Sequence, residues 1–313
     1  MANKAKRWPA EASRGPRLRI LSRKQAKTSA KQKVATRPLV TSFGLVRQTF
    51  DLLAKHWRIL GGIVVVYLIL NIVFASGLSD LNNTLSNIKD NINTNGQHKF
   101  LTALGGFSGL LGTAGASGSQ TGSALQTMLI ILESLVIIWA LRQIVAGQLI
   151  GVKQAYYQAT GPLIPFLLVL AVIFIQLLPI TLGAAVLNFV LGSTLLNSSL
   201  LIAIFATILI PLTIWSVYMI SGSIFALYIV TLPEMTPRAA LRSAKNLVKF
   251  RRLKVIRRLV FLPVFIFLVA GVVIIPLILF ANWLVLPIFY ALSMIGILFI
   301  HSYLYGLYRE LLQ

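Results

Sequence analysis

Four long apolar stretches dominate the hydrophobic pattern of the chain. Residues 59–79 contain no charged side chain, residues 154–233 are 80 consecutive uncharged positions, and residues 259–308 are another 50. Residues 124–146 are similarly apolar but include Glu133 and Arg142. Because one membrane-spanning helix needs about 20 mostly apolar residues, the two longest stretches each predict two spans. The predicted spans are about 59–78, 124–146, 163–191, 200–231, 259–280 and 284–308, with an outward loop at 79–123.

Basic residues are distributed unevenly between the segments that connect these spans. The segments on one side of the membrane contain 27 of the 29 Lys and Arg residues, and the 79–123 loop contains the other two. The positive-inside rule therefore predicts that both termini are cytoplasmic. An odd number of spans would break this alternation, so the charge pattern supports six.

The composition excludes an ordinary soluble domain. The chain has 313 residues, is 57% hydrophobic and 12% charged, and has a net charge of +22. Charged residues make up about a quarter of a typical soluble domain, and disordered chains are poor in apolar residues. The composition thus predicts an all-α polytopic membrane bundle. Its first apolar run begins too far from the N-terminus for a cleaved signal peptide, so we expect an uncleaved signal anchor.

Residues 1–38 are rich in Lys, Arg, Ala and Ser and show no sustained apolar period. They predict a disordered basic cytoplasmic tail, followed by the membrane domain over 39–313. Each basic residue near an anionic membrane surface contributes about 1 kcal/mol of attraction. Basic tracts also bind RNA, but Trp8 is the only aromatic residue there that could stack on a base. We therefore favour anionic lipid and do not expect nucleic acid as a partner. A membrane tether for RNA or the ribosome is the weaker alternative.

Residues 42–58 and 236–249 have apolar residues at helical spacing. In the first segment the apolar positions are Phe43, Val46, Phe50, Leu53 and Trp57. Such a stripe predicts either an interfacial helix on the cytoplasmic leaflet or a helix packed against the spans.

In the second segment, Thr236 and Pro237 predict an N-cap and a first helical residue. The apolar stripe that follows is Ala240, Leu241, Ala244, Leu247 and Val248. Nine basic residues lie in 232–258 against Glu234 alone. A basic amphipathic helix is typically a membrane-surface element, so we predict contacts with anionic lipid headgroups. A specific anionic substrate or an RNA is the alternative. The predicted contact residues are Arg238, Arg242, Lys245, Lys249, Arg251, Arg252, Lys254, Arg257 and Arg258.

The chain contains a short internal similarity. Residues 152–166 align with 236–250 at an offset of 84. The identical pairs are Ala155 with Ala239, Leu163 with Leu247, and Phe166 with Phe250. We hypothesise three repeated units, each an interfacial helix followed by a two-span hairpin, which would form a pseudo-symmetric bundle.

Residues 225–263 resemble the cytoplasmic segment of a group of six-span bacterial membrane proteins. The group includes the glycerophosphoryl diester phosphodiesterase membrane-domain family and related uncharacterised families. The shared features are Pro233-Glu234, Ala239-Ala240, Arg242-Ser243, Leu247 and the basic stretch after them. The resemblance implies a six-span fold over most of 42–310 in a bacterial plasma membrane. It implies no enzyme, because that family's phosphodiesterase chemistry belongs to a separate catalytic domain.

Catalytic and metal-binding patterns are missing from the sequence. The chain has no cysteine, no HExxH, no phosphate-binding loop and no GxSxG. Its histidines, His56, His98 and His301, are predicted on different sides of the membrane. We expect no catalytic residues, no metal and no cofactor.

Glu133 is the only acid within a predicted span, about 14 Å from its outer end. A proton-coupled carrier would use such a carboxylate. The alternative, which we favour, is a structural side chain that is protonated or bonded to Gln176, Asn188 or Asn71. Glu133, Gln176 and Asn188 form the candidate intramembrane polar site.

These patterns favour a non-enzymatic integral membrane protein that engages anionic lipid through basic cytoplasmic helices. It could also assist a protein partner in the membrane. The alternative is a transporter of a lipid or small molecule with a cavity near Glu133. A polar cavity open to one side would favour the transporter, and a solidly packed bundle would favour the first hypothesis.

Overall fold

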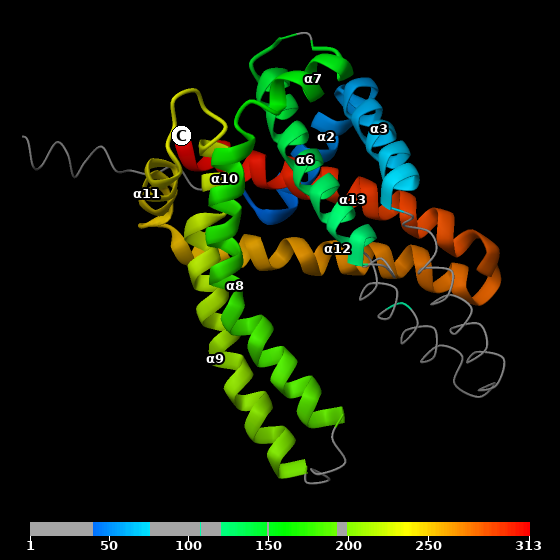
Figure 1. Cartoon of the computed structure of the whole chain (residues 1–313), viewed down its shortest axis with the longest axis vertical. Coiled ribbons are helices and arrows are strands. Elements are labelled where there is room, and N and C mark those ends of the chain that lie inside the picture. Colours follow the sequence, from blue (N-terminus) through cyan, green and yellow to red (C-terminus); the bar gives the residue numbers. More distant parts are fainter. Residues whose placement is uncertain (1–39, 76–106, 108–119, 149, 193–198) are drawn as a thin grey trace, which may run out of the picture. The chain divides into compact units, whose positions relative to one another are not determined.

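The computed structural model describes residues 40–75, 107, 120–148, 150–192 and 199–313 (Figure 1). The described part of the chain is helical and contains no strand. Its main helices are α2 (Ser42–Lys55), α3 (Trp57–Ala75), α6 (Gln120–Val145), α7 (Val152–Ala159), α8 (Leu163–Gly192), α9 (Ser199–Ser223), α10 (Ala226–Ile229), α11 (Pro237–Val248), α12 (Arg252–Phe280) and α13 (Asn282–Leu312).

Six of these helices are long and apolar enough to cross a membrane: α3, α6, α8, α9 with α10, α12 and α13. The predicted all-α, multi-pass fold is thereby confirmed. The predictions about the 1–38 tail and the 79–123 loop, apart from Phe107 and the first residues of α6, lie outside the described residues. So does the segment 193–198, which lies between the third and fourth predicted spans.

The long helices pack in three sequential pairs, α3 with α6, α8 with α9, and α12 with α13. Figure 1 shows the two members of the second pair, and of the third, side by side. A short helix precedes each pair, namely α2, α7 and α11. This order matches the three predicted units. The residue alignment between units is not matched by burial, since Phe166 is buried and Phe250 is exposed.

Helix α11 begins as its sequence predicts. The Thr236 side chain accepts a hydrogen bond from the Ala239 backbone N–H at 3.4 Å, and Pro237 is the first helical residue. Ala240, Ala244 and Val248 are buried. The helix packs against α8, α9, α10 and α13. Its apolar face is therefore used inside the protein, not inserted into lipid.

Helix α2 packs against α13 and α3 through Leu45, Val46 and Thr49. Of the predicted stripe, Val46 is buried while Phe43 and Phe50 are exposed. The Phe50 ring lies 5.2 Å from the ring of Phe299 on α13. The helix thus packs against the spans on one side, which is one of the two interpretations that the pattern allowed.

An aromatic side chain from the predicted outward loop is buried in the core formed by α3, α12 and α13. Phe107 is fully buried, and its ring lies 5.3 Å from that of Phe267. A Cβ added at Gly271 would lie 3.5 Å from Cε1 of Phe107, an ordinary van der Waals contact, so the ring packs closely on α12 without requiring a glycine there. Since lipid tails are as apolar as the helices, this contact contributes through close packing and not through removal of water.

Helix α7 can approach α3 closely because of Gly62. A Cβ added at Gly62 would lie 2.8 Å from Cγ2 of Val152, the first residue of α7. A Cβ at the neighbouring Gly61 would meet nothing within 4 Å. Valine cannot readily turn away, because its branched side chain has few allowed rotamers.

We predict that Gly62→Ala lowers stability by about 1–3 kcal/mol, because it overpacks the contact between α3 and α7. Gly61→Ala is the matched control and should be neutral or stabilising, since alanine is the better helix former. The measurement is thermal unfolding of the purified protein in detergent. Equal shifts for the two variants would show that α7 does not dock at this position.

Candidate functional site

Helix α11 and the start of α12 present a row of exposed cations. The exposed members are Arg238, Arg242, Lys245 and Lys249 on α11, and Lys254 and Arg257 on α12. The acid in the 232–258 stretch is Glu234. Because the opposite face of α11 is buried, the cations of this helix lie on its outward face, and Lys254 and Arg257 on α12 are also exposed. We call these six residues the basic surface.

The corner between α11 and α12 exposes two large apolar side chains among these cations. Phe250 is 84% exposed and Leu253 is 83% exposed. The Lys249 Nζ lies 5.8 Å from the centre of the Phe250 ring. Apolar side chains flanked by basic ones are typical of segments at the boundary between headgroups and acyl chains.

Arg251 and Arg252, two of the predicted contact residues, are only half-exposed. The Arg252 guanidinium lies 3.9 Å above the ring of Tyr218 on α9, a cation–π contact. It also lies over Gly222, where a Cβ would come within 2.8 Å of Nη2. Arg252 therefore links α12 to α9, and its guanidinium contacts protein groups more than it contacts the surroundings.

The prediction that Arg258 contacts lipid is wrong. Arg258 is 4% exposed, and its Nη1 donates a hydrogen bond to Glu310 Oε2 at 2.9 Å in an ion pair. Its Nη2 donates to the Val40 carbonyl oxygen. The sequence contained a signal for this, because Val255, Arg258 and Leu262 recur at helical spacing and all three are buried.

Glu133 is 1% exposed, and its Oε2 lies 2.7 Å from the hydroxyl oxygen of Tyr156 on α7. Sequence analysis missed Tyr156, because nothing in the pattern indicates that α7 folds back onto α3 and α6. The structure does not bring Glu133 together with the other two residues of the candidate polar site. Gln176 Oε1 is buried without a partner, and the Asn188 side chain is outside the described residues. Asn71 instead donates to Tyr67 and accepts from Tyr290.

The Tyr156 hydroxyl has one proton but two neighbouring acceptors. It lies 3.1 Å from the Ile63 carbonyl oxygen as well as 2.7 Å from Glu133. Burial, and then the nearby Glu133 carboxyl, raise the pKa of Tyr156, so its hydroxyl remains a donor. The Tyr156 hydroxyl therefore donates to Glu133 Oε2 and is shared with the Ile63 carbonyl oxygen, as in a three-centre hydrogen bond.

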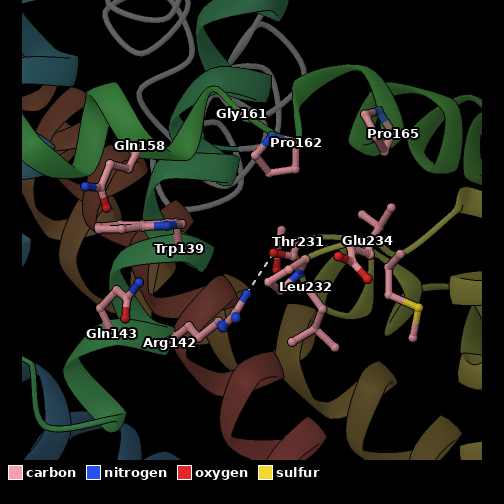
Figure 2. A pocket seen from close by; sticks show the side chains of 13 residues that line it. Trp139, Arg142, Gln143, Gln158, Gly161, Pro162, Pro165, Thr231, Leu232 and Glu234 are labelled. Atoms are coloured by element: carbon pink, nitrogen blue, oxygen red, sulfur yellow. Dashed lines mark hydrogen bonds between the residues drawn. The ribbon is translucent and has the colours of Figure 1, made fainter.

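A pocket of about 500 Å³ lies where the end of α6, the turn between α7 and α8, and residues 230–235 meet (Figure 2). Its lining includes Trp139, Arg142, Gln158, Thr231 and Glu234. Arg142 Nη1 donates to the Thr231 carbonyl oxygen at 2.7 Å. Glu133 is not in the lining, so this pocket is separate from the cavity that the transporter hypothesis expected.

Comparisons of the chain with models of protein families, with curated proteins and with solved structures find no match. The resemblance of residues 225–263 to the glycerophosphoryl diester phosphodiesterase membrane-domain family stays a prediction.

We predict that Arg258→Met costs about 3 kcal/mol of stability, because it leaves the largely buried Glu310, 13% exposed, without its cation. Arg257→Met removes the same charge from the adjacent, exposed position and should change stability by less than about 0.5 kcal/mol. Denaturation of both variants in detergent micelles provides the comparison. Similar stability of the two variants would contradict the buried pair.

We also predict that Glu133 is a neutral acid and that Glu133→Gln leaves stability nearly unchanged, because the glutamine amide oxygen accepts from Tyr156 as the carboxyl oxygen does. Tyr156→Phe should cost about 1–3 kcal/mol, since it leaves the buried carboxyl without a partner. Thermal unfolding of both variants, together with an infrared band of a protonated carboxyl that disappears in Glu133→Gln, is the measurement. An ionised Glu133 would give no such band and would make Glu133→Gln destabilising.

Proposed function

We propose that this chain is a non-enzymatic, multi-pass protein of a bacterial plasma membrane that binds anionic lipid headgroups through its basic surface. The observation that carries the proposal is the division of α11 into two faces. Ala240, Ala244 and Val248 pack inside the protein, which leaves the cations of the other face exposed. A row of exposed cations on a packed helix, with a single nearby acid, can attract several anionic headgroups at once.

The proposed orientation places this surface at the inner leaflet. The positive-inside distribution puts both termini and the connection between α10 and α12 in the cytoplasm. Anionic lipids give that leaflet a negative potential, and each basic residue near it contributes about 1 kcal/mol. Six exposed cations at one place are therefore sufficient for local enrichment of anionic lipid.

The exposed corner between α11 and α12 adds an apolar contribution to this electrostatic one. Phe250 and Leu253 lie next to the cations, so both groups can meet the membrane boundary together. Insertion of such side chains among headgroups depends little on salt, whereas the attraction of the cations weakens as salt increases.

A second candidate function, transport of a lipid or small molecule, is supported by the pocket lined by Arg142 and Glu234. A transporter would need this pocket to open alternately to both sides of the membrane. Binding of RNA by the basic tail is the third candidate.

The headgroup proposal is tested with protein reconstituted into vesicles of phosphatidylcholine containing spin-labelled phosphatidylglycerol. Replacing Arg238, Arg242, Lys245 and Lys249 with Gln should reduce the preference for phosphatidylglycerol about tenfold or more, given about 1 kcal/mol per cation. The matched control replaces four exposed cations outside α11, namely Arg47, Lys55, Lys153 and Arg309. Equal loss in both variants would mean that net charge alone, and not α11, attracts the lipid.

The absence of cysteine allows a second test by single-cysteine labelling without background. We predict that a nitroxide on Phe250→Cys lies below the headgroups, where oxygen reaches it more readily than a water-soluble nickel complex. A nitroxide on Asn246→Cys, on the exposed side of α11, should show the opposite preference. If both labels contact water equally, the corner does not enter the membrane boundary.

A further inference from the structure

The pocket beside Arg142 has the size and the mixed lining of a small-molecule site. Its volume of about 500 Å³ lies within the range of about 300–1,000 Å³ that is usual for ligand pockets. Trp139, Pro162 and Leu232 supply apolar walls, and amide side chains from Gln143 and Gln158 supply polar ones. None of these residues belongs to the basic surface.

One wall of the pocket carries a fixed cation. The Arg142 guanidinium is held by its hydrogen bond to the Thr231 carbonyl oxygen, which uses one of its five N–H donors. Within the described part of the chain, the ion pair found is that of Arg258 with Glu310. Arg142 therefore has a fixed position and no acidic partner, which suits a planar, two-pronged contact with a phosphate.

Another wall of the pocket includes the acid Glu234, whose backbone conformation is unusual. Glu234 has φ of 60°, and it is the one non-glycine residue with positive φ among those described. Such a conformation is uncommon for a residue with a side chain and persists where the surrounding structure imposes it. Figure 2 shows the Arg142 and Glu234 side chains on either side of Thr231. The pocket thus presents one positive and one negative group that are not paired with each other.

We propose that this pocket binds a zwitterionic group in which a phosphate lies close to an ammonium, as in phosphoethanolamine. The phosphate contacts Arg142 and the ammonium contacts Glu234, while the apolar walls accept the adjoining carbon chain. A group with only negative charge satisfies Arg142 but is repelled by Glu234. The pocket therefore discriminates against the purely anionic lipids that the basic surface attracts. The inference rests on the proposed function only for the presence of headgroups at this side of the membrane.

The test is calorimetric titration of the purified full-length protein in detergent. The probes are dihexanoyl phosphatidylethanolamine, dihexanoyl phosphatidylglycerol and free phosphoethanolamine. We expect the ethanolamine lipid to bind about tenfold or more tightly than the glycerol lipid, as one charge-assisted contact would give. Glu234→Gln should abolish this preference, because it weakens binding of the ethanolamine lipid and removes the repulsion of the glycerol lipid. Arg142→Gln should weaken both lipids by a similar factor.

Matched controls separate the pocket from general charge effects. Asp51→Asn and Lys153→Gln each remove one exposed charge outside the pocket lining and should leave both affinities unchanged. The α11 variant that lacks Arg238, Arg242, Lys245 and Lys249 should retain the preference for ethanolamine, even if it loses enrichment of phosphatidylglycerol. This result distinguishes failure of the pocket from failure of the basic surface.

The proposal is overturned if the wild type binds the two lipids equally, or if Glu234→Gln behaves as Asp51→Asn does. A loss of preference in the α11 variant would also overturn it. Free phosphoethanolamine distinguishes the source of the ligand. Binding as tight as that of the lipid indicates a soluble ligand, and weaker binding indicates a lipid whose carbon chain uses the apolar walls. Either result supports the chemistry of the site.

Discussion

Polar groups within apolar helices have no water to bind inside a membrane, so a partner within the protein strongly stabilises them. Three contacts provide such partners here. Tyr290 on α13 donates to Asn71 on α3, Tyr156 on α7 joins Glu133 to Ile63, and Arg258 on α12 pairs with Glu310 on α13. Each joins segments that are far apart in the sequence. Together they determine which helices pack together, in a medium where apolar packing alone favours few arrangements.

The same contacts determine which cations remain for other roles. Arg258 is used between α12 and α13, and Arg252 is used against Tyr218 on α9. The cations of α11 stay exposed because that helix packs its small residues, Ala240 and Ala244, against the bundle. The basic surface is therefore a rigid array and not a loose amphipathic helix. We propose two kinds of headgroup contact for the chain, a broad electrostatic one at α11 and a selective one in the pocket of Arg142 and Glu234.

The six spans and the start of α11 could be predicted from the sequence, because both follow from local rules of hydropathy and capping. The division of basic residues into buried and exposed could be predicted only in part. Arg258 could have been assigned to the buried face from its spacing to Val255 and Leu262, but its partner Glu310 is 52 positions away. Tyr156 and Phe107 could not have been found, because each packs against helices that are distant from it in the sequence. Glu234 could not have been connected to Arg142 for the same reason.

The central claim is that anionic lipid gathers at the basic surface, and photo-crosslinking tests it most directly. The full-length protein would be reconstituted with phosphatidylglycerol that carries a photoreactive headgroup, and the crosslinked peptides would be mapped by mass spectrometry. We predict crosslinks concentrated in residues 238–257 and reduced by high salt, with no such concentration for a photoreactive phosphatidylcholine. Crosslinks spread evenly around the spans, or the same pattern with both lipids, would contradict it.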